Sequence, residues 1–174
     1  MNNTVINSLI ERRSIRSYKP EMVSEDILDE ILRAGTYAAT GMNRQSPIII
    51  AVKDKEAREA VRKMNAEIIG SPASDPFYGA PVILIVLADP SIPTYVEDGS
   101  LVLGNMMNAA HALGVGSCWI HRAKQEFERE DGKRLLRAWG VEGNYVGIGH
   151  LALGYIDGEY PVTRDRKTNY IFKV

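Results

Sequence analysis

The fold is limited most by four strand-length apolar runs that alternate with segments of helical periodicity. Residues 47–52 (PIIIAV) and 81–88 (PVILIVLA) are almost continuously aliphatic, which is typical of buried strands. Runs at 115–120 and 145–155 predict two further strands. Because helical segments separate the four strands, we expect an α+β or mixed three-layer domain around a sheet of about four strands.

Apolar residues at helical spacing predict five helices. Ser24 is expected to cap the second, because Glu25 and Asp26 follow it in the first turn. The fourth is apolar nearly all round, which is typical of a helix at the centre of the molecule or in a subunit interface. Gly132 argues against one unbroken fifth helix. Asn3 or Thr4 is expected to cap the first helix, which ends at Ile10, and the others cover residues 25–35, 55–69, 98–113 and 125–139.

Composition narrows the class of protein. The 174 residues, of which 45% are hydrophobic and 25% charged, predict a single globular domain over residues 1–174. A net charge of −1 gives no general attraction to nucleic acid or to an anionic membrane, and no apolar run is long enough to cross a bilayer. The lone cysteine, Cys118, is expected to be a buried structural thiol. It suits a cytoplasmic location, as does an N-terminus without the basic region of a signal peptide.

Several kinds of catalytic site are disfavoured by the motifs. There is no phosphate-binding loop of the Walker type and no serine nucleophile elbow. Residues 147–154 (GIGHLALG) lack dinucleotide-binding spacing, and their glycines are expected to admit a backbone or a flat ring. His111, His121 and His150 have no cysteine or carboxylate at metal-ligand spacing, so no metal site is expected. The charge run at 126–134 is interpreted as a solvated helix face.

Two basic clusters lie near opposite ends of the chain, at residues 12–18 (RRSIRSY) and 161–167 (PVTRDRK). Guanidinium groups with neighbouring hydroxyls suit phosphate oxygens, and Asn43 and Gln45 add polar groups in a loop. The clusters predict a site for a phosphorylated cofactor, closed by both ends of the chain. The alternative for the first cluster is a solvated helix end, where cations interact favourably with the helix dipole.

Five segments, in order from residue 10 to residue 167, resemble the FMN-dependent nitroreductase family. They are 11–18 (ERRSIRSY), 38–45 (AATGMNRQ), 80–86 (APVILIV), 109–120 (AAHALGVGSCWI), and 153–155 (LGY) followed by Arg164 and Arg166. The resemblance implies an α+β, three-layer nitroreductase-like fold, with a central and mostly antiparallel sheet flanked by helices. It also implies an intertwined homodimer.

The resemblance further implies two FMN sites across the subunit interface. The first cluster would meet the FMN phosphate, the ribityl chain and the polar edge of the ring, and the second would close on the phosphate. The partner subunit would supply a loop, and Asp98 lies where a partner polar residue often reaches the flavin. Backbone at the end of the third strand would lie near the reactive nitrogen of the flavin. The residues implied are Arg12, Arg13, Ser14, Arg16, Arg164 and Arg166, then Thr40, Gly41 and Asn43 of the loop, Ile120 and His121 of the backbone, and Asn65 for the ring or ribityl.

The activity implied is that of an FMN-dependent NAD(P)H oxidoreductase with nitroaromatic, quinone or similar acceptors. One cleft would serve donor and acceptor in turn, which implies ping-pong kinetics, and no side chain is expected to act as nucleophile or general base. Two alternatives stay open: a non-catalytic dimer that binds FMN or another phosphorylated ligand, and a family member with a specialised reaction such as dehalogenation. The chain is short for the family, and His121 replaces a residue that is often acidic, so the acceptor is left open.

Overall fold

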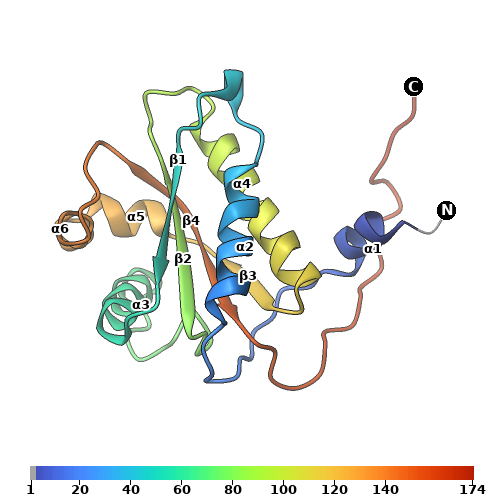
Figure 1. Cartoon of the computed structure of the whole chain (residues 1–174), viewed down its shortest axis with the longest axis horizontal. Helices are drawn as coiled ribbons and strands as arrows, with labels where there is room; N and C mark the ends of the chain where they lie inside the picture. The colour runs from blue at the N-terminus through green and yellow to red at the C-terminus, as the bar shows by residue number, and fades with distance from the viewer. Residues whose placement is uncertain (1–2) are drawn as a thin grey trace.

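Residues 3–174 of the computed structural model fold into three layers, with helices on both faces of one sheet (Figure 1). The layers confirm the predicted α+β class. The elements are α1 (Thr4–Glu11), α2 (Glu25–Thr36), the short 3-10 helix η1 (Gly41–Asn43), β1 (Pro47–Val52), α3 (Lys55–Ile69), β2 (Val82–Ala88), α4 (Tyr95–Ala112), β3 (Gly116–Ile120), α5 (Ala123–Glu128), α6 (Glu130–Ala138) and β4 (Val146–Gly154).

The sheet has four strands in the order β1-β2-β4-β3, and every neighbouring pair is antiparallel. The central strand β2 is buried along its whole length, and its side chains alternate between two cores. Ile83, Ile85 and Leu87 belong to the core beneath α3, α5 and α6, and Val82 and Leu84 belong to the core beneath α2 and α4. Burial on both faces explains why β2 reads as a continuous apolar run.

Strand β1 differs from its prediction as a buried strand, because only Val52 is fully buried. It lies at the edge of the sheet and pairs on one side with β2. No other strand among the described residues covers its second side. Three consecutive isoleucines at residues 48–50 are therefore only half-buried within one copy of the chain.

Two helices differ from the sequence prediction. Helix α4 begins at Tyr95, three residues before the predicted start. The predicted helix at 125–139 is two helices, α5 and α6, which meet at Arg129, where ψ is 155°. Gly132 lies in α6 against the backbone of Glu126 and Phe127, so the two helices pack closer than a β-carbon would allow. No helix in residues 3–174 is long and apolar enough to cross a membrane.

The glycines of β4 have the predicted role of admitting close neighbours. A β-carbon on Gly147 would collide with the carbonyl group of Ala123. A β-carbon on Gly149 would lie 2.8 Å from the indole ring of Trp119. One glycine thus admits a backbone and the other a flat ring, which brings α5 and β3 tightly against β4.

Candidate functional site

The first basic cluster is extended chain beside the sheet rather than the end of a helix. Helix α1 stops at Glu11, and Arg12 already has a ψ of 132°. Ser14 pairs with Ser117 of β3 in a parallel bridge, and the N–H of Ile15 donates to the Ser117 carbonyl at 3.0 Å. The cluster is thereby fixed along the free edge of β3, with Ile15 buried beneath it.

The C-terminal arm, residues 155–167, returns to the same place. The N–H of Lys19 donates to the Tyr155 carbonyl at 2.9 Å, and Tyr18 bridges Ile156. Further along, the Tyr160 hydroxyl accepts from the N–H of Arg13 at 3.0 Å and donates to the Glu11 carbonyl at 3.1 Å. These bonds set the second basic cluster against the first.

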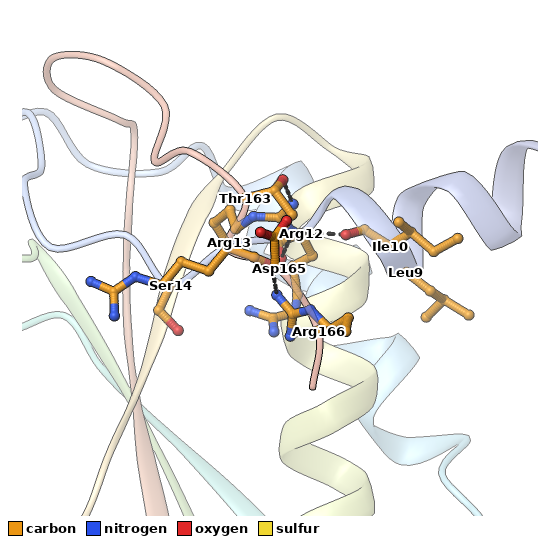
Figure 2. Close-up of a pocket in the computed structure, with 9 residues that line it drawn as sticks. Leu9, Ile10, Arg12, Arg13, Ser14, Thr163, Asp165 and Arg166 are labelled. Carbon is orange, nitrogen blue, oxygen red and sulfur yellow. Dashed lines mark hydrogen bonds between the residues drawn. The ribbon is translucent and has the colours of Figure 1, made fainter. Parts of the chain in front are cut away.

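Both clusters line a cavity of about 660 Å³, shown in Figure 2. A second cavity of about 610 Å³ adds Arg16, and it shares with the first Arg13, Ser14, Thr163, Arg164 and Arg166. The structure therefore brings together six of the residues that the sequence assigned to a phosphate site. The first cavity is lined by Leu9, Ile10, Arg12, Arg13, Ser14, Thr163, Arg164, Asp165 and Arg166.

The guanidiniums of this site carry charge that the described residues do not neutralise. None of the five arginines forms an ion pair with a carboxylate within residues 3–174. Arg13 donates to the carbonyls of Ile10 (2.7 Å) and Arg12 (2.8 Å) and to the Thr163 hydroxyl. Its Nε and the Nη1 of Arg12 are buried and have no acceptor. Buried donors without acceptors are costly, and phosphate oxygens would satisfy them.

A second group of predicted residues lies at the other end of α4. The Asp98 carboxylate is buried and accepts from the Gly41 N–H at 2.9 Å and from the Thr94 hydroxyl at 3.1 Å. The Thr40 hydroxyl accepts from the Gln45 N–H at 3.1 Å. Asp98 thus supports the loop of residues 40–46 from inside.

This loop holds backbone in the left-handed region at three residues other than glycine: Met42 (φ 54°), Asn43 (φ 54°) and Gln45 (φ 51°). Such conformations cost energy and are common at functional sites. Met42 is also 85% exposed. The sequence pattern predicted a loop here but not its strain.

The loop and the arginine cavity are far apart within one copy of the chain. Asp98 lies near the start of α4, whereas His111, near its end, contacts Tyr160 of the C-terminal arm at 3.2 Å. Thirteen residues of helix separate the two positions by about 20 Å. The structure therefore does not bring Thr40, Gly41, Asn43 or Asp98 to the arginines of the same protomer.

A third group surrounds the turn after β3. Ile120 is buried at the end of the strand, and the carbonyl of the exposed residue His121 accepts from Asn65 at 3.0 Å. Arg122 follows in the left-handed region with a φ of 82°. Beneath this turn lies Glu126, which is fully buried, in contrast to the solvated face predicted for its charge run. It lies on the buried side of α5 with Ala123 and Phe127.

Two buried groups beside the first cluster have shifted acidities. Burial raises the pKa of the Cys118 thiol, as expected for a structural cysteine, although Arg16 lowers it in part. Burial also raises the pKa of Tyr18, whose hydroxyl donates to the Ile15 carbonyl at 2.7 Å. Neither group is poised for chemistry near neutral pH. No set of three or more metal-ligating side chains is found among residues 3–174.

The sequence pattern of the Nitroreductase family matches residues 9–76 and 70–155, which together span most of the chain. The chain belongs to the Nitroreductase family. Its fold closely matches a nitroreductase with bound FMN from Bacteroides fragilis, at a TM-score of 0.90 and 29% identity over 99% of this chain and 100% of that one. A nitroreductase with bound FMN from Desulfitobacterium hafniense has a TM-score of 0.89 and 26% identity, with all of both chains covered.

Sequence relatives agree with this membership. An FMN reductase [NAD(P)H] from Bacillus subtilis is 31% identical over 137 residues, which cover 66% of this chain and 53% of the relative. An NADH dehydrogenase from Thermus thermophilus is 30% identical over 147 residues, covering 83% of this chain and 64% of the relative. The resemblance drawn from the five sequence segments is confirmed at the level of family and fold.

Proposed function

We propose that this protein is an FMN-dependent NAD(P)H oxidoreductase that reduces nitroaromatic, quinone or similar acceptors. The observation that carries the proposal is the cavity between the two basic clusters, where buried guanidinium N–H groups of Arg12 and Arg13 lack acceptors. The FMN phosphate carries about −1.5 to −2 charges near neutral pH, which several guanidiniums would offset. The family members with bound FMN support this cofactor.

In the proposed site the phosphate is held by the two clusters, and the ring extends along β3. The chain from Ser117, beside Ser14, to His121 covers about 13 Å of extended backbone. That length suits a cofactor with a phosphate at one end and a ring at the other. The backbone of Ile120 and His121 would then lie near the reactive nitrogen. The proposed ligands of the phosphate, the ribityl chain and the polar edge of the ring are Arg12, Arg13, Ser14, Arg16, Arg164 and Arg166.

We propose that the site is completed by a second copy of the chain. Apolar side chains remain exposed on α1 (Ile10, 65%), on α4 (Leu101, 50%) and on the C-terminal tail, residues 168–174 (Phe172, 81%). Exposed apolar groups of this extent are typical of surfaces that become buried in an assembly. Since the loop of residues 40–46 cannot reach the arginine cavity of its own protomer, Thr40, Gly41, Asn43 and the supporting Asp98 would serve the FMN of the partner.

The chemistry belongs to FMN, which when bound accepts a hydride from a reduced nicotinamide and passes it to the acceptor. The residues of the chain bind and orient. Arg16, exposed at the side of the second cavity, is proposed to stabilise negative charge at the polar edge of the ring. Because one cleft serves donor and acceptor in turn, the kinetics are expected to be ping-pong. Intersecting initial-velocity lines with a compulsory ternary complex would contradict this scheme.

The decisive experiment is the absorption spectrum of the purified protein before and after anaerobic addition of NADH or NADPH. Flavin bands that bleach with the nicotinamide, and recover with a nitroaromatic or quinone, are the expected result. A protein that binds FMN but is not reduced would leave the non-catalytic binding alternative. A colourless protein that cannot be reconstituted with FMN would overturn the proposal.

A further inference from the structure

A buried polar network lies directly beneath the turn of residues 120–122. Its members come from three elements: Asn65 from α3, Glu126 from α5 and His150 from β4. All three have no exposed surface, although polar side chains of this kind are rarely buried without a partner. From the sequence, Asn65 was expected to be a cofactor ligand, Glu126 to lie on a solvated helix face, and His150 to have no metal-binding role.

Both the N–H₂ group and the oxygen of the Asn65 amide form hydrogen bonds within the protein. Its N–H₂ donates to the His121 carbonyl at 3.0 Å and to the Glu126 carboxylate. Its oxygen accepts from Nε of Arg122 at 3.0 Å. An amide offers two donors and one acceptor oxygen, so both ends of this side chain are occupied. Asn65 therefore holds two consecutive residues of the turn at once.

Of those two residues, Arg122 has a backbone conformation that needs stabilisation. Arg122 has a φ of 82°, in the left-handed region that side chains with a β-carbon disfavour and glycine adopts freely. The bond from its Nε to Asn65 offsets part of that cost. No hydrogen bond from the backbone N–H of either His121 or Arg122 is found within residues 3–174, so the turn leaves two donors unused.

Glu126 and His150 lie behind Asn65, and neither Glu126 Oε2 nor the two ring nitrogens of His150 form a hydrogen bond within residues 3–174. The Glu126 carboxylate and His150 Nε2 are 3.2 Å apart and fully buried. The imidazole lies between two phenylalanines, with ring centroids 5.3 Å from Phe77 and 6.2 Å from Phe127. The Glu126 carboxylate is enclosed on all sides, so it is an acceptor of fixed position for the Asn65 amide.

We propose that Asn65 is a positioning residue, which together with Glu126 fixes the left-handed turn at Arg122 and so presents the free N–H groups of His121 and Arg122 to the flavin. The role of the turn as flavin contact rests on the proposed function. Asn65 itself touches no cofactor in this arrangement. It acts through the backbone of the turn, to which it is linked by the hydrogen bond from Arg122 Nε to its oxygen.

Two substitutions of Arg122 test the role of its hydrogen bond to Asn65. Arg122→Ala loses Nε but keeps a β-carbon, so the turn should relax and FMN binding should weaken about tenfold, the effect of one lost hydrogen bond to a charged group. Arg122→Gly also loses Nε but adopts the left-handed conformation freely, so it should bind FMN within about twofold of the wild type. Equal effects of the two substitutions would overturn the proposal.

The role of Asn65 is tested by rescue. Asn65→Ala should weaken FMN binding and shift the midpoint potential of the bound flavin, because fewer aligned donors face the charge of its reduced form. Adding Arg122→Gly to Asn65→Ala should restore both quantities in large part. If Asn65 is instead a direct ligand, the glycine rescues neither, and the proposal fails. Asn105→Ala is the matched control, since this asparagine donates to the Ala34 carbonyl at 3.1 Å on the other side of the sheet.

Hydrogen exchange in FMN-free protein separates this inference from the proposed function. Asn65→Ala should accelerate exchange in residues 119–123, and Asn105→Ala should leave that segment unchanged. If the wild type binds no FMN but the two variants differ in exchange as expected, the proposed function is contradicted and the role of Asn65 in the turn is still supported. A wild-type protein that binds FMN and shows no change in exchange contradicts the network alone. If Asn65→Ala does not fold, the comparison of Arg122→Ala with Arg122→Gly still tests whether the hydrogen bond between Arg122 and Asn65 fixes the turn.

Discussion

At the scale of single residues, the site is defined by arginines without carboxylate partners. Arg12 and Arg13 have buried N–H groups with no acceptor, and Arg16, Arg164 and Arg166 are exposed at the rims of the two cavities. Five of the other eight arginines in the described chain form ion pairs, as Arg58 does with Asp75 at 2.7 Å. What distinguishes the site is that five arginines without carboxylate partners gather around two adjoining cavities.

Arg16→Ala and Arg164→Ala are each expected to weaken FMN binding by about 1.5–3 kcal/mol, the value of a charge-assisted hydrogen bond. Flavin fluorescence on titration of FMN into the FMN-free protein measures the change. Arg33→Ala is the control, because Arg33 is exposed on α2 and pairs with Glu30. Full affinity in the double variant of Arg16 and Arg164 would remove the phosphate-clamp assignment.

Asp75 should make folding stability depend on pH. Burial acts to raise its pKa, but the hydrogen bonds from Arg58 and from the N–H groups of Phe77 and Gly79 outweigh it, so the pKa lies below its usual value. A carboxyl with a lowered native pKa stabilises the fold above about pH 4 and loses that contribution as pH falls further.

We therefore expect Asp75→Asn to lower the melting temperature at pH 7, by the equivalent of about 1 kcal/mol. The gap between variant and wild type should narrow when thermal unfolding is repeated near pH 3. A gap of the same size at both values of pH would show that the carboxylate charge does not contribute.

At the scale of elements, neighbours override local preference. Gly132 lies inside α6, where alanine has the higher helical propensity by about 1 kcal/mol. A β-carbon there would collide with the Glu126 carbonyl of α5. The run at 125–139 is two helices that break at Arg129, and Glu126 lies on the buried side of the first.

Gly132→Ala is accordingly expected to destabilise the protein by about 1–3 kcal/mol, since the contact is with rigid backbone. Gly104→Ala in α4 is the comparison, because nothing lies within 4 Å of its would-be β-carbon. It should be neutral or stabilising by up to about 1 kcal/mol. Urea denaturation measures both, and an equally stable Gly132→Ala would contradict the packing argument.

At the scale of the whole molecule, the parts of the proposed site lie at both ends of α4, about 20 Å apart. The exposed apolar side chains of α1, α4 and the C-terminal tail are the surface that a second copy would bury. Assembly and cofactor binding are therefore expected to fail together.

Leu101→Glu, on the exposed side of α4, should shift the mass measured by light scattering from dimer to monomer and reduce the FMN content of the purified protein. Met22→Glu is the control, since Met22 is similarly exposed but lies outside α1, α4 and the tail. A monomeric variant with full FMN content would show that one copy forms the whole site. A monomeric wild type would contradict the proposed assembly.

The sequence by itself determined the elements and the chemistry of the basic clusters. Strand and helix periods depend on neighbours a few residues apart, so 47–52, 55–69 and the loop at 70–79 could be predicted from the sequence. The glycines of β4 also have the role that the sequence predicted for them. The basic clusters were recognisable because guanidiniums beside hydroxyls point to phosphate in any fold.

Only the tertiary structure decided which charged and polar residues are buried. Glu126 lies in a run of charges that has the pattern of a solvated face, and Asn65 and Arg122 carry no sequence signal for their contact. β1 read as a buried strand, yet it lies at the edge of the sheet. The burial of a polar side chain and the place of a strand in the sheet depend on residues that are distant in the chain, so local patterns do not determine them.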